Sequence, residues 1–114
     1  MRIAMVAHHG CCRVFKEAQM LMNEGHDVAI LSQNIIGIDL MRWHTWMRYW
    51  DQYQLMRSVE VLDKAGYEIF HVHNEPDWIV SATRRATDKP VIFDVHDLES
   101  ARIATAVPKE EIDL

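Results

Sequence analysis

Histidine is the residue type with which this sequence could most readily do chemistry. Five of its seven histidines follow or end short apolar segments, and these are His8, His9, His71, His73 and His96. A single histidine in such a place is more often structural than functional. Imidazole can nevertheless accept a proton near neutral pH and form hydrogen bonds in both directions. Further polar side chains lie just beyond the last two segments, namely Asn74, Glu75, Asp97 and Glu99. The set as a whole therefore indicates a site for a polar ligand.

The segments that must position these residues have the pattern of a parallel sheet. Four runs rich in Val, Ile and Phe predict strands over residues 2–7, 27–32, 68–73 and 90–96. The first and last are nearly continuous apolar runs, which is typical of strands buried on both faces. Side-chain alternation places His71 and His73 on one face of their strand, and Asp94 with His96 on one face of the next.

Two helices are predicted before the third strand. Residues 13–24 carry apolar side chains on one helical face, and Gly25 follows where a helix end favours a left-handed residue. Strand, helix, glycine and strand form a βαβ unit, whose crossover should be right-handed. Residues 39–64 are helical in composition, and Gly66 is the expected stop.

Two further helices complete the predicted order. One covers residues 75–86, with Asn74 as N-cap and Pro76 in the first turn, and the other covers 98–104 after Asp97. The alternation of strands and helices predicts an α/β fold. It is an open, doubly wound, Rossmann-like parallel sheet of about four strands, in the order 2-1-3-4, with helices on both faces. Ligands of such sheets bind beyond the carboxyl ends of the strands, where the order reverses.

Size and composition limit the class of protein. The chain has 114 residues, which fit one domain, and 49% apolar with 25% charged residues is a globular composition. A formal net charge of -5 argues against a nucleic-acid partner. No apolar run reaches the roughly 18 residues that span a bilayer. Cys11 and Cys12 are adjacent and have no third cysteine to pair with, which favours a reducing, cytoplasmic location.

Other chemistries fit parts of the sequence. Histidines two apart with carboxylates nearby could ligate zinc, but no established zinc spacing occurs, so we predict no metal ligand. After the first strand, Gly10 stands without the further glycines of a phosphate loop, although the next helix start could attract an anion with Arg13 assisting. Cys11 or Cys12 could act as a nucleophile near that helix start, but small residues fitting a turn are the simpler interpretation.

A stripe of aromatic residues occupies the middle of the chain. Trp43, Trp46, Trp50 and Tyr53 recur at helical spacing. Packing against the sheet is the simplest interpretation. Because arginines are interleaved, the stripe also fits an interfacial helix beside lipid headgroups, a groove for a bulky acceptor, or a surface that packs on another domain. Peripheral membrane contact through the three tryptophans therefore stays an open alternative.

Four stretches of the chain, in this order, resemble the N-terminal domain of GT-B glycosyltransferases of the large retaining family four. They read MRIAMVAHH, RVFKEAQMLMNEGHDVAIL, YEIFHVHNEPD and KPVIFDVHDLES. The family pattern has a helix R-V-x-K-E-A-x-x-L with G-H-x-V after it, then H-x-H with N-E-P, then P-V-x-x-D-x-H-D. The resemblance covers most of the chain except its tryptophan-rich middle. The matching residues are Arg13, Val14, Lys16, Glu17, Ala18, Leu21, Gly25, His26, Val28, His71, His73, Asn74, Glu75, Pro76, Pro90, Val91, Asp94, His96 and Asp97.

The resemblance implies transfer of a sugar from a nucleotide-sugar donor to an acceptor, with retention and without a metal or other cofactor. Residues 1–114 would be one incomplete N-terminal domain, inactive alone, that shapes the acceptor side of the cleft. Its partner would be a C-terminal Rossmann domain that holds the donor. The catalytic candidates are His73 and His96, and the substrate-binding candidates are Gly10, Arg13, Asn74, Glu75 and Asp97. The loop after the first strand lacks the family's paired glycines.

Two alternatives come from other classes of protein. One is a stand-alone binding or partner domain without catalysis, which could be membrane-peripheral. The other is a small metal-dependent hydrolase that uses the histidines at the edge of the sheet.

Overall fold

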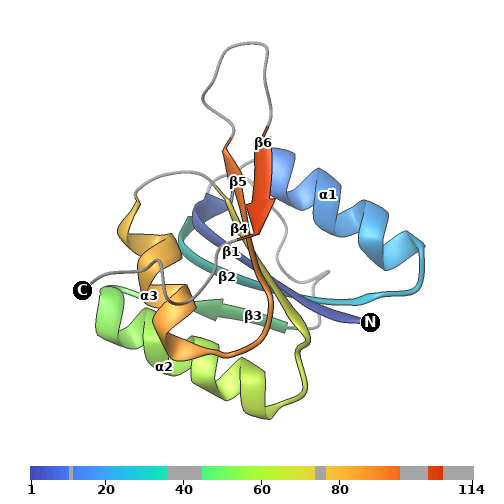
Figure 1. Ribbon diagram of the computed structural model, residues 1–114. Helices are drawn as coiled ribbons and strands as arrows, with labels where there is room; N and C mark the ends of the chain where they lie inside the picture. Colours follow the sequence, from blue (N-terminus) through green and yellow to red (C-terminus); the bar gives the residue numbers. More distant parts are fainter. Residues whose placement is uncertain (11, 36–44, 74–76, 96–102, 107–114) are drawn as a thin grey trace.

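The computed structural model describes residues 1–10, 12–35, 45–73, 77–95 and 103–106, which form an α/β fold on one six-stranded sheet (Figure 1). The strands are β1 (Arg2–Gly10), β2 (Asp27–Ile35), β3 (Thr45–Arg48), β4 (Ile69–His73), β5 (Val91–Val95) and β6 (Ile103–Ala106). The helices in these ranges are α1 (Cys12–Asn23), α2 (Gln52–Lys64) and α3 (Trp78–Ala86). The sheet order is β3-β2-β1-β4-β5-β6, in which β6 alone is antiparallel to its neighbour.

The four predicted strands are present as β1, β2, β4 and β5. Their predicted order 2-1-3-4 corresponds to the observed run β2-β1-β4-β5, and every pairing within it is parallel. The prediction of about four strands is too small, because β3 and β6 extend the sheet at its two edges.

The prediction of one helix over residues 39–64 is wrong in part. Thr45–Arg48 forms β3, in which Trp46 is the register partner of Ile30 in β2. The helix α2 begins only after Asp51, whose side chain accepts a hydrogen bond from the Gln54 backbone N–H at 2.9 Å. Asp51 is therefore a side-chain N-cap, which fixes the helix start.

The ends of the other predicted helices show both agreement and difference. Gly25, after α1, has φ of +93°, and Gly66, after α2, has φ of +97°, as expected for left-handed residues that follow helices. The helix α3 starts at Trp78 with Asp77 in the N-cap position, whereas the expected cap Asn74 lies outside the described residues. The predicted helix over 98–104 is wrong at its end, because Ile103–Ala106 pairs with β5 as strand β6.

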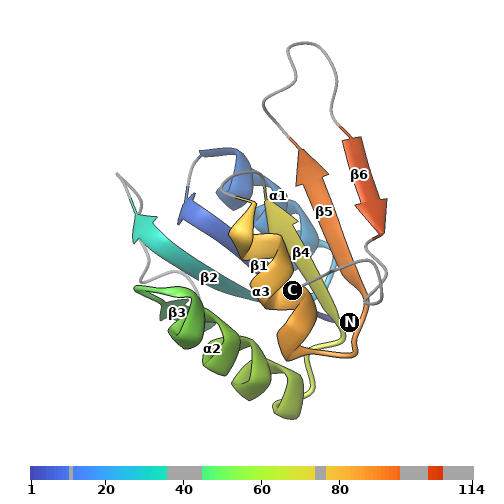
Figure 2. The same ribbon diagram turned by 60° about the vertical axis from the view of Figure 1, so that its left-hand side comes forward.

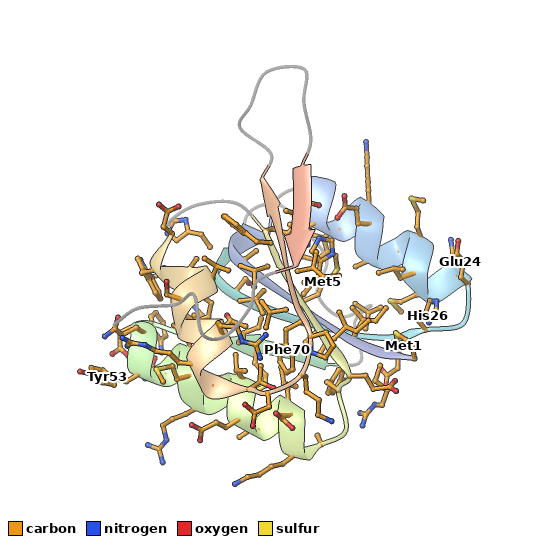
Figure 3. All side chains as sticks on the ribbon, in the orientation of Figure 1. Met1, Met5, Glu24, His26, Tyr53 and Phe70 are labelled. Atoms are coloured by element: carbon orange, nitrogen blue, oxygen red, sulfur yellow. The ribbon has the colours of Figure 1, made fainter. Side chains whose placement is uncertain are left out.

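The helices lie on both faces of the sheet, as predicted. Figure 2 shows α1 on one face and α2 with α3 on the other. On the α1 face, Met5 of β1 packs with Val14 and Ala18 of the helix. On the opposite face, Phe70 of β4 packs in a larger cluster with Leu55 of α2 and Ile79 of α3 (Figure 3). Fully burying each such aliphatic or aromatic side chain contributes about 1.5–3 kcal/mol.

Tyr49 connects the segment after β3 to the centre of the sheet. Its hydroxyl donates a buried hydrogen bond of 2.7 Å to the backbone oxygen of Ala7, near the end of β1. Its ring makes a T-shaped contact with the ring of Trp78 at a centroid distance of 6.0 Å. Ala7 is also the register partner of His73 in β4. Tyr49 thus braces the sheet next to one of the predicted site histidines.

The tryptophan stripe does not have the predicted helical geometry. Trp46 lies in β3, Trp50 lies in the turn before α2, and Trp43 lies outside the described residues. Trp50 is 58% exposed, and the Arg48 guanidinium lies 3.9 Å from its ring centroid. Tyr53 on α2 is also exposed (Figure 3). Within the described ranges, no helix is both long enough and apolar enough to cross a membrane.

Candidate functional site

Four ionisable side chains converge between α1 and the sheet, and we call them the Glu17–His71–His73–Asp94 cluster. Their potential ligand atoms all lie within 4.8 Å of one another. His71 Nε2 is 3.1 Å from Asp94 Oδ2, and His73 Nδ1 is 3.7 Å from Glu17 Oε2. One helix and two neighbouring strands, which are distant in sequence, therefore contribute to a single polar centre.

The alternation of β4 explains why both histidines belong to the cluster. His71 and His73 are register partners of Met5 and Ala7 in β1, and those two residues belong to the core under α1. Val72, between the histidines, belongs to the core on the opposite face. Both imidazoles must therefore project toward α1.

The other two members of the cluster come from the elements next to β4. Asp94 on β5 is the register partner of His73, so both side chains share a face of the sheet. On α1, Glu17 lies three residues after Val14 and directly before Ala18, which are both buried against the sheet. Glu17 consequently borders the apolar stripe of α1, on the side from which its carboxylate reaches His73.

The cluster is largely withdrawn from solvent. The side chains of His73 and Asp94 are 2% and 1% exposed, whereas those of Glu17 and His71 are 16% and 19% exposed. The two imidazole rings stack at a centroid distance of 4.2 Å and an interplanar angle of 27°. Because a buried carboxylate is costly unless it is paired, the contact with His71 stabilises Asp94 in this position.

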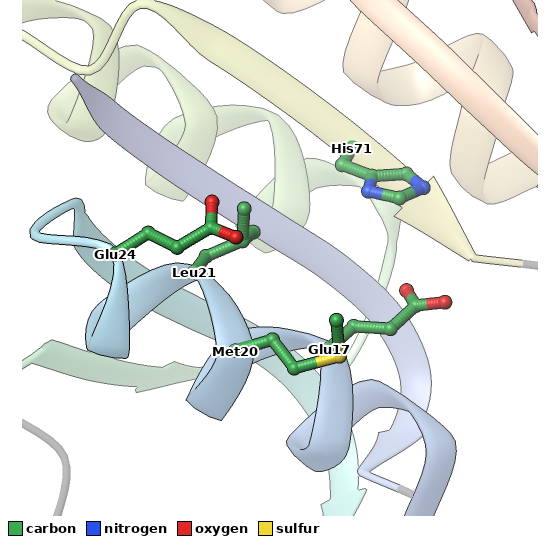
Figure 4. Close-up of a pocket in the computed structure, with 5 residues that line it drawn as sticks. All are labelled: Glu17, Met20, Leu21, Glu24 and His71. Carbon is green, nitrogen blue, oxygen red and sulfur yellow. The ribbon is translucent and has the colours of Figure 1, made fainter.

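A hollow of about 310 Å³ opens beside the cluster, lined by Glu17, Met20, Leu21, Glu24 and His71. Figure 4 shows that α1 supplies one wall of this hollow, with Glu17 in it, and that His71 of β4 lies across from it. Glu17 and His71 belong both to the hollow and to the cluster, so the cluster is accessible from the hollow. The volume lies at the lower end of the range for small-molecule sites.

The predicted site residues are only partly brought together by the described structure. His73 is in the cluster, buried beneath α1. Gly10 ends β1, and Arg13 lies in the first turn of α1, the helix that follows this strand in the chain. The remaining predicted residues lie outside the described ranges, and they are His96, Asn74, Glu75 and Asp97.

Glu17 and Asp94 of the cluster were not among the predicted site residues, and His71 was counted in the polar set at the sheet edge without a catalytic or binding role. Strand alternation already placed His71 with His73, and the next strand placed Asp94 at the same edge. Glu17 was harder to predict, because its position depends on which face of α1 packs on the sheet. All three residues lie in the sequence stretches that resemble the family, but the sequence did not show that their side chains converge.

The chain matches no model of a known protein family, and neither a search of curated proteins nor a search of solved structures finds a match. What the fold and the site define is an open α/β sheet with a histidine–carboxylate cluster beneath its first helix. A functional assignment must therefore rest on the geometry of the site.

Proposed function

We propose that this chain forms the acceptor side of a retaining, nucleotide-sugar-dependent glycosyltransferase, as its N-terminal Rossmann-like half. The observation that best supports the proposal is the place of His73. It is the last residue of β4, the strand next to β1 on the side opposite β2. The chain adds β2 and β3 on one side of β1 and then returns to add β4 and β5 on the other side. The strand order therefore reverses between β1 and β4. Parallel α/β sheets bind their ligands at such points.

In this proposal the cluster residues have different tasks. His73 would hydrogen-bond to the acceptor hydroxyl from the end of β4, together with His96, Asn74, Glu75 and Asp97 along the acceptor side. His71 and Asp94 would be positioning residues, because Asp94 lies within hydrogen-bonding distance of His71 and the His71 ring stacks on His73. A ring fixed in this way loses little entropy when it binds a ligand.

The donor side of the reaction requires a second wall. Gly10 and Arg13 lie where β1 leads into α1, and the start of a helix attracts anions. They would face the donor phosphates, while a second Rossmann domain would hold the nucleotide sugar. The 114 residues by themselves would then be inactive, and no metal or other cofactor would be needed for transfer.

The test uses the product of the natural reading frame that contains these residues. It is incubated with UDP-, GDP- and ADP-sugars, with water as the default acceptor, and release of the nucleoside diphosphate is measured. We expect slow turnover that falls at least about 100-fold in His73→Ala, as expected when a group acting in the transition state is removed. Because His73 is buried, His73→Asn serves as a second variant, and circular dichroism verifies the fold of both.

The matched control is His26→Ala. His26 lies in the turn between α1 and β2, at the far end of α1 from the cluster (Figure 3). We expect this variant to retain full turnover. The proposal is wrong if no nucleotide sugar is consumed, or if folded His73→Asn protein is as active as the His26→Ala control.

A further inference from the structure

We infer that the Glu17–His71–His73–Asp94 cluster binds one divalent transition-metal ion, for which Zn²⁺ is the best fit. The inference goes beyond glycosyl transfer and does not depend on it, since it rests only on four side chains from α1, β4 and β5. A sugar-transfer role for this chain could fail while the metal site is present, and the reverse also holds.

The distances within the cluster suit a tetrahedral ion. Zinc binds imidazole nitrogen and carboxylate oxygen at about 2.0–2.2 Å, so two ligands of a tetrahedral site lie about 3.3–3.6 Å apart. His71 Nε2 lies 3.1 Å from Asp94 Oδ2, and His73 Nδ1 lies 3.7 Å from Glu17 Oε2. All four ligand atoms already lie within 4.8 Å of one another. Side-chain rotation would have to bring the most widely separated ligand atoms about 1 Å closer together to close the shell.

The charges and donor types favour the same ion. Two carboxylates within 4.8 Å repel each other when ionised, and little solvent is present to screen Asp94. A divalent cation between them removes that repulsion, and neutral imidazoles complete the shell. An all-oxygen ion such as Mg²⁺ fits less well, because half of the donors are nitrogen. Protonation of the two imidazoles could supply the positive charge in place of a metal ion. A measurement of metal binding distinguishes these two explanations.

The number of ligands indicates what the ion does. Four protein ligands fill a tetrahedral shell, which is typical of structural zinc, whereas catalytic zinc keeps one position for water. The ion would join α1 to the adjacent strands β4 and β5, with access from the hollow lined by Glu17 and His71. Since an unfolded chain has no such site, binding stabilises the fold. The inferred role is therefore a cross-link, which disfavours a metal-dependent hydrolase.

The experiment uses the 114-residue chain, stripped of metal with a chelator. The adjacent thiols of Cys11 and Cys12 could bind zinc by themselves, so both are replaced by serine in every sample. Zn²⁺ alone is titrated against a chromophoric chelator. We expect one equivalent to bind, and Tm to rise by about 5 °C or more when free zinc is in hundredfold excess over Kd. Co²⁺ in place of zinc should show the intense visible absorption of tetrahedral cobalt. Mg²⁺ should neither bind in the titration nor change Tm.

A matched pair of variants on α1 locates the site. Glu17→Gln removes one ligand charge, whereas Glu24→Gln changes a carboxylate two turns away that lines the same hollow. We expect zinc affinity to fall at least about tenfold for Glu17→Gln and to stay unchanged for Glu24→Gln. Asp94→Asn should weaken zinc binding more than Glu17→Gln does. Because Asp94 is buried, this variant counts only if its circular dichroism is that of the parent.

Two results would overturn the inference. One is the absence of any zinc-dependent change in Tm, with no equivalent of zinc bound. The other is binding that Glu17→Gln and Glu24→Gln weaken equally or not at all, which would place the ion elsewhere on the chain. Either result would leave the cluster as a hydrogen-bonded network whose charge is balanced by protons.

Discussion

Tyr49 shows how one buried hydroxyl makes stability depend on pH. Burial raises the pKa of Tyr49 above its ordinary value, because the phenolate would lose its hydration in the core. In the unfolded chain the group ionises at about pH 10, while in the folded chain it stays neutral to higher pH. The stability gained from the neutral form is therefore complete below about pH 10 and is lost progressively as pH rises toward the folded pKa.

We expect Tyr49→Phe to show less of this loss between pH 9 and about pH 11 than the parent. At pH 7 the variant should be destabilised by about 0.5–1.5 kcal/mol, since the hydrogen bond to the Ala7 carbonyl is removed. Urea unfolding at each pH measures both effects. Tyr53→Phe is the control, because Tyr53 is 71% exposed and its replacement should change neither quantity. Equal pH profiles for parent and Tyr49→Phe would contradict the argument.

At the residue scale, the sequence was informative where strand alternation applies. Alternation placed His73 and His71 on one face, and the structure stacks their rings. It could not show that Glu17 would join them, because the reach of a helical side chain depends on how the helix packs on the sheet. His96 and Asp97 lie outside the described residues, so their assignment stays a prediction.

At the scale of the elements, the start of α2 depends on a local interaction. The Asp51 side chain accepts from the Gln54 backbone N–H, and the Gln54 side chain accepts from the Trp50 backbone N–H at 2.7 Å. The pair resembles a capping box, except that Gln54 accepts from the N–H of Trp50, the residue before the N-cap, instead of from that of Asp51. The same pair ends the extended segment that contains β3.

We expect Asp51→Ala to lower the free energy of unfolding by about 1 kcal/mol, because one N–H at the start of α2 loses its acceptor. Asp51→Asn keeps a side-chain oxygen and should lose much less. The midpoint of urea unfolding measures both variants, with unchanged slope as evidence that the folded state is the same. An alanine variant as stable as the asparagine variant would show that the cap contributes nothing.

The glycines that follow α1 and α2 can be compared directly, because each occupies the position after a helix end. Gly25 and Gly66 both have strongly positive φ, which costs an L-residue about 1–2 kcal/mol. A Cβ at Gly66 would lie 3.1 Å from Arg2 Nη1, whereas none of the described atoms lies within 4 Å of a Cβ at Gly25. We expect Gly66→Ala to be destabilised at least as much as Gly25→Ala in thermal unfolding. A smaller loss at Gly66 would mean that Arg2 moves aside without cost.

Elements that depend on distant pairing were the ones that the sequence failed to predict. Residues 39–64 were predicted as a helix from their composition, but Thr45–Arg48 within them pairs with β2 and becomes β3. Ile103–Ala106 likewise becomes β6 by pairing with β5. The four predicted strands were recognisable because all are rich in Val, Ile and Phe, and the first and last are nearly continuous apolar runs, which is typical of strands buried on both faces. Edge strands are buried less and paired on one side, so their local sequence constrains them less.

The arrangement of the whole molecule predicts how stability is distributed over the sheet. β1 pairs with β2 on one side and β4 on the other, and its residues Ala4, Met5 and Val6 are completely buried. β3 lies at an edge, has four residues and pairs only with β2 in the described sheet. Opening β3 therefore breaks one ladder, whereas opening β1 exposes both cores of the molecule.

We expect backbone amides of β1 to exchange with solvent at a rate set by global unfolding, and those of β3 at least about 100-fold faster, through local opening. Native-state hydrogen exchange, followed by NMR over a series of low urea concentrations, gives the opening free energy of each strand. β2 is the internal control, because it pairs with both β1 and β3 and should be as protected as β1 in the part that faces β1. Exchange of β3 as slow as that of β1, with the same urea dependence, would show that the edge strand unfolds only with the entire sheet.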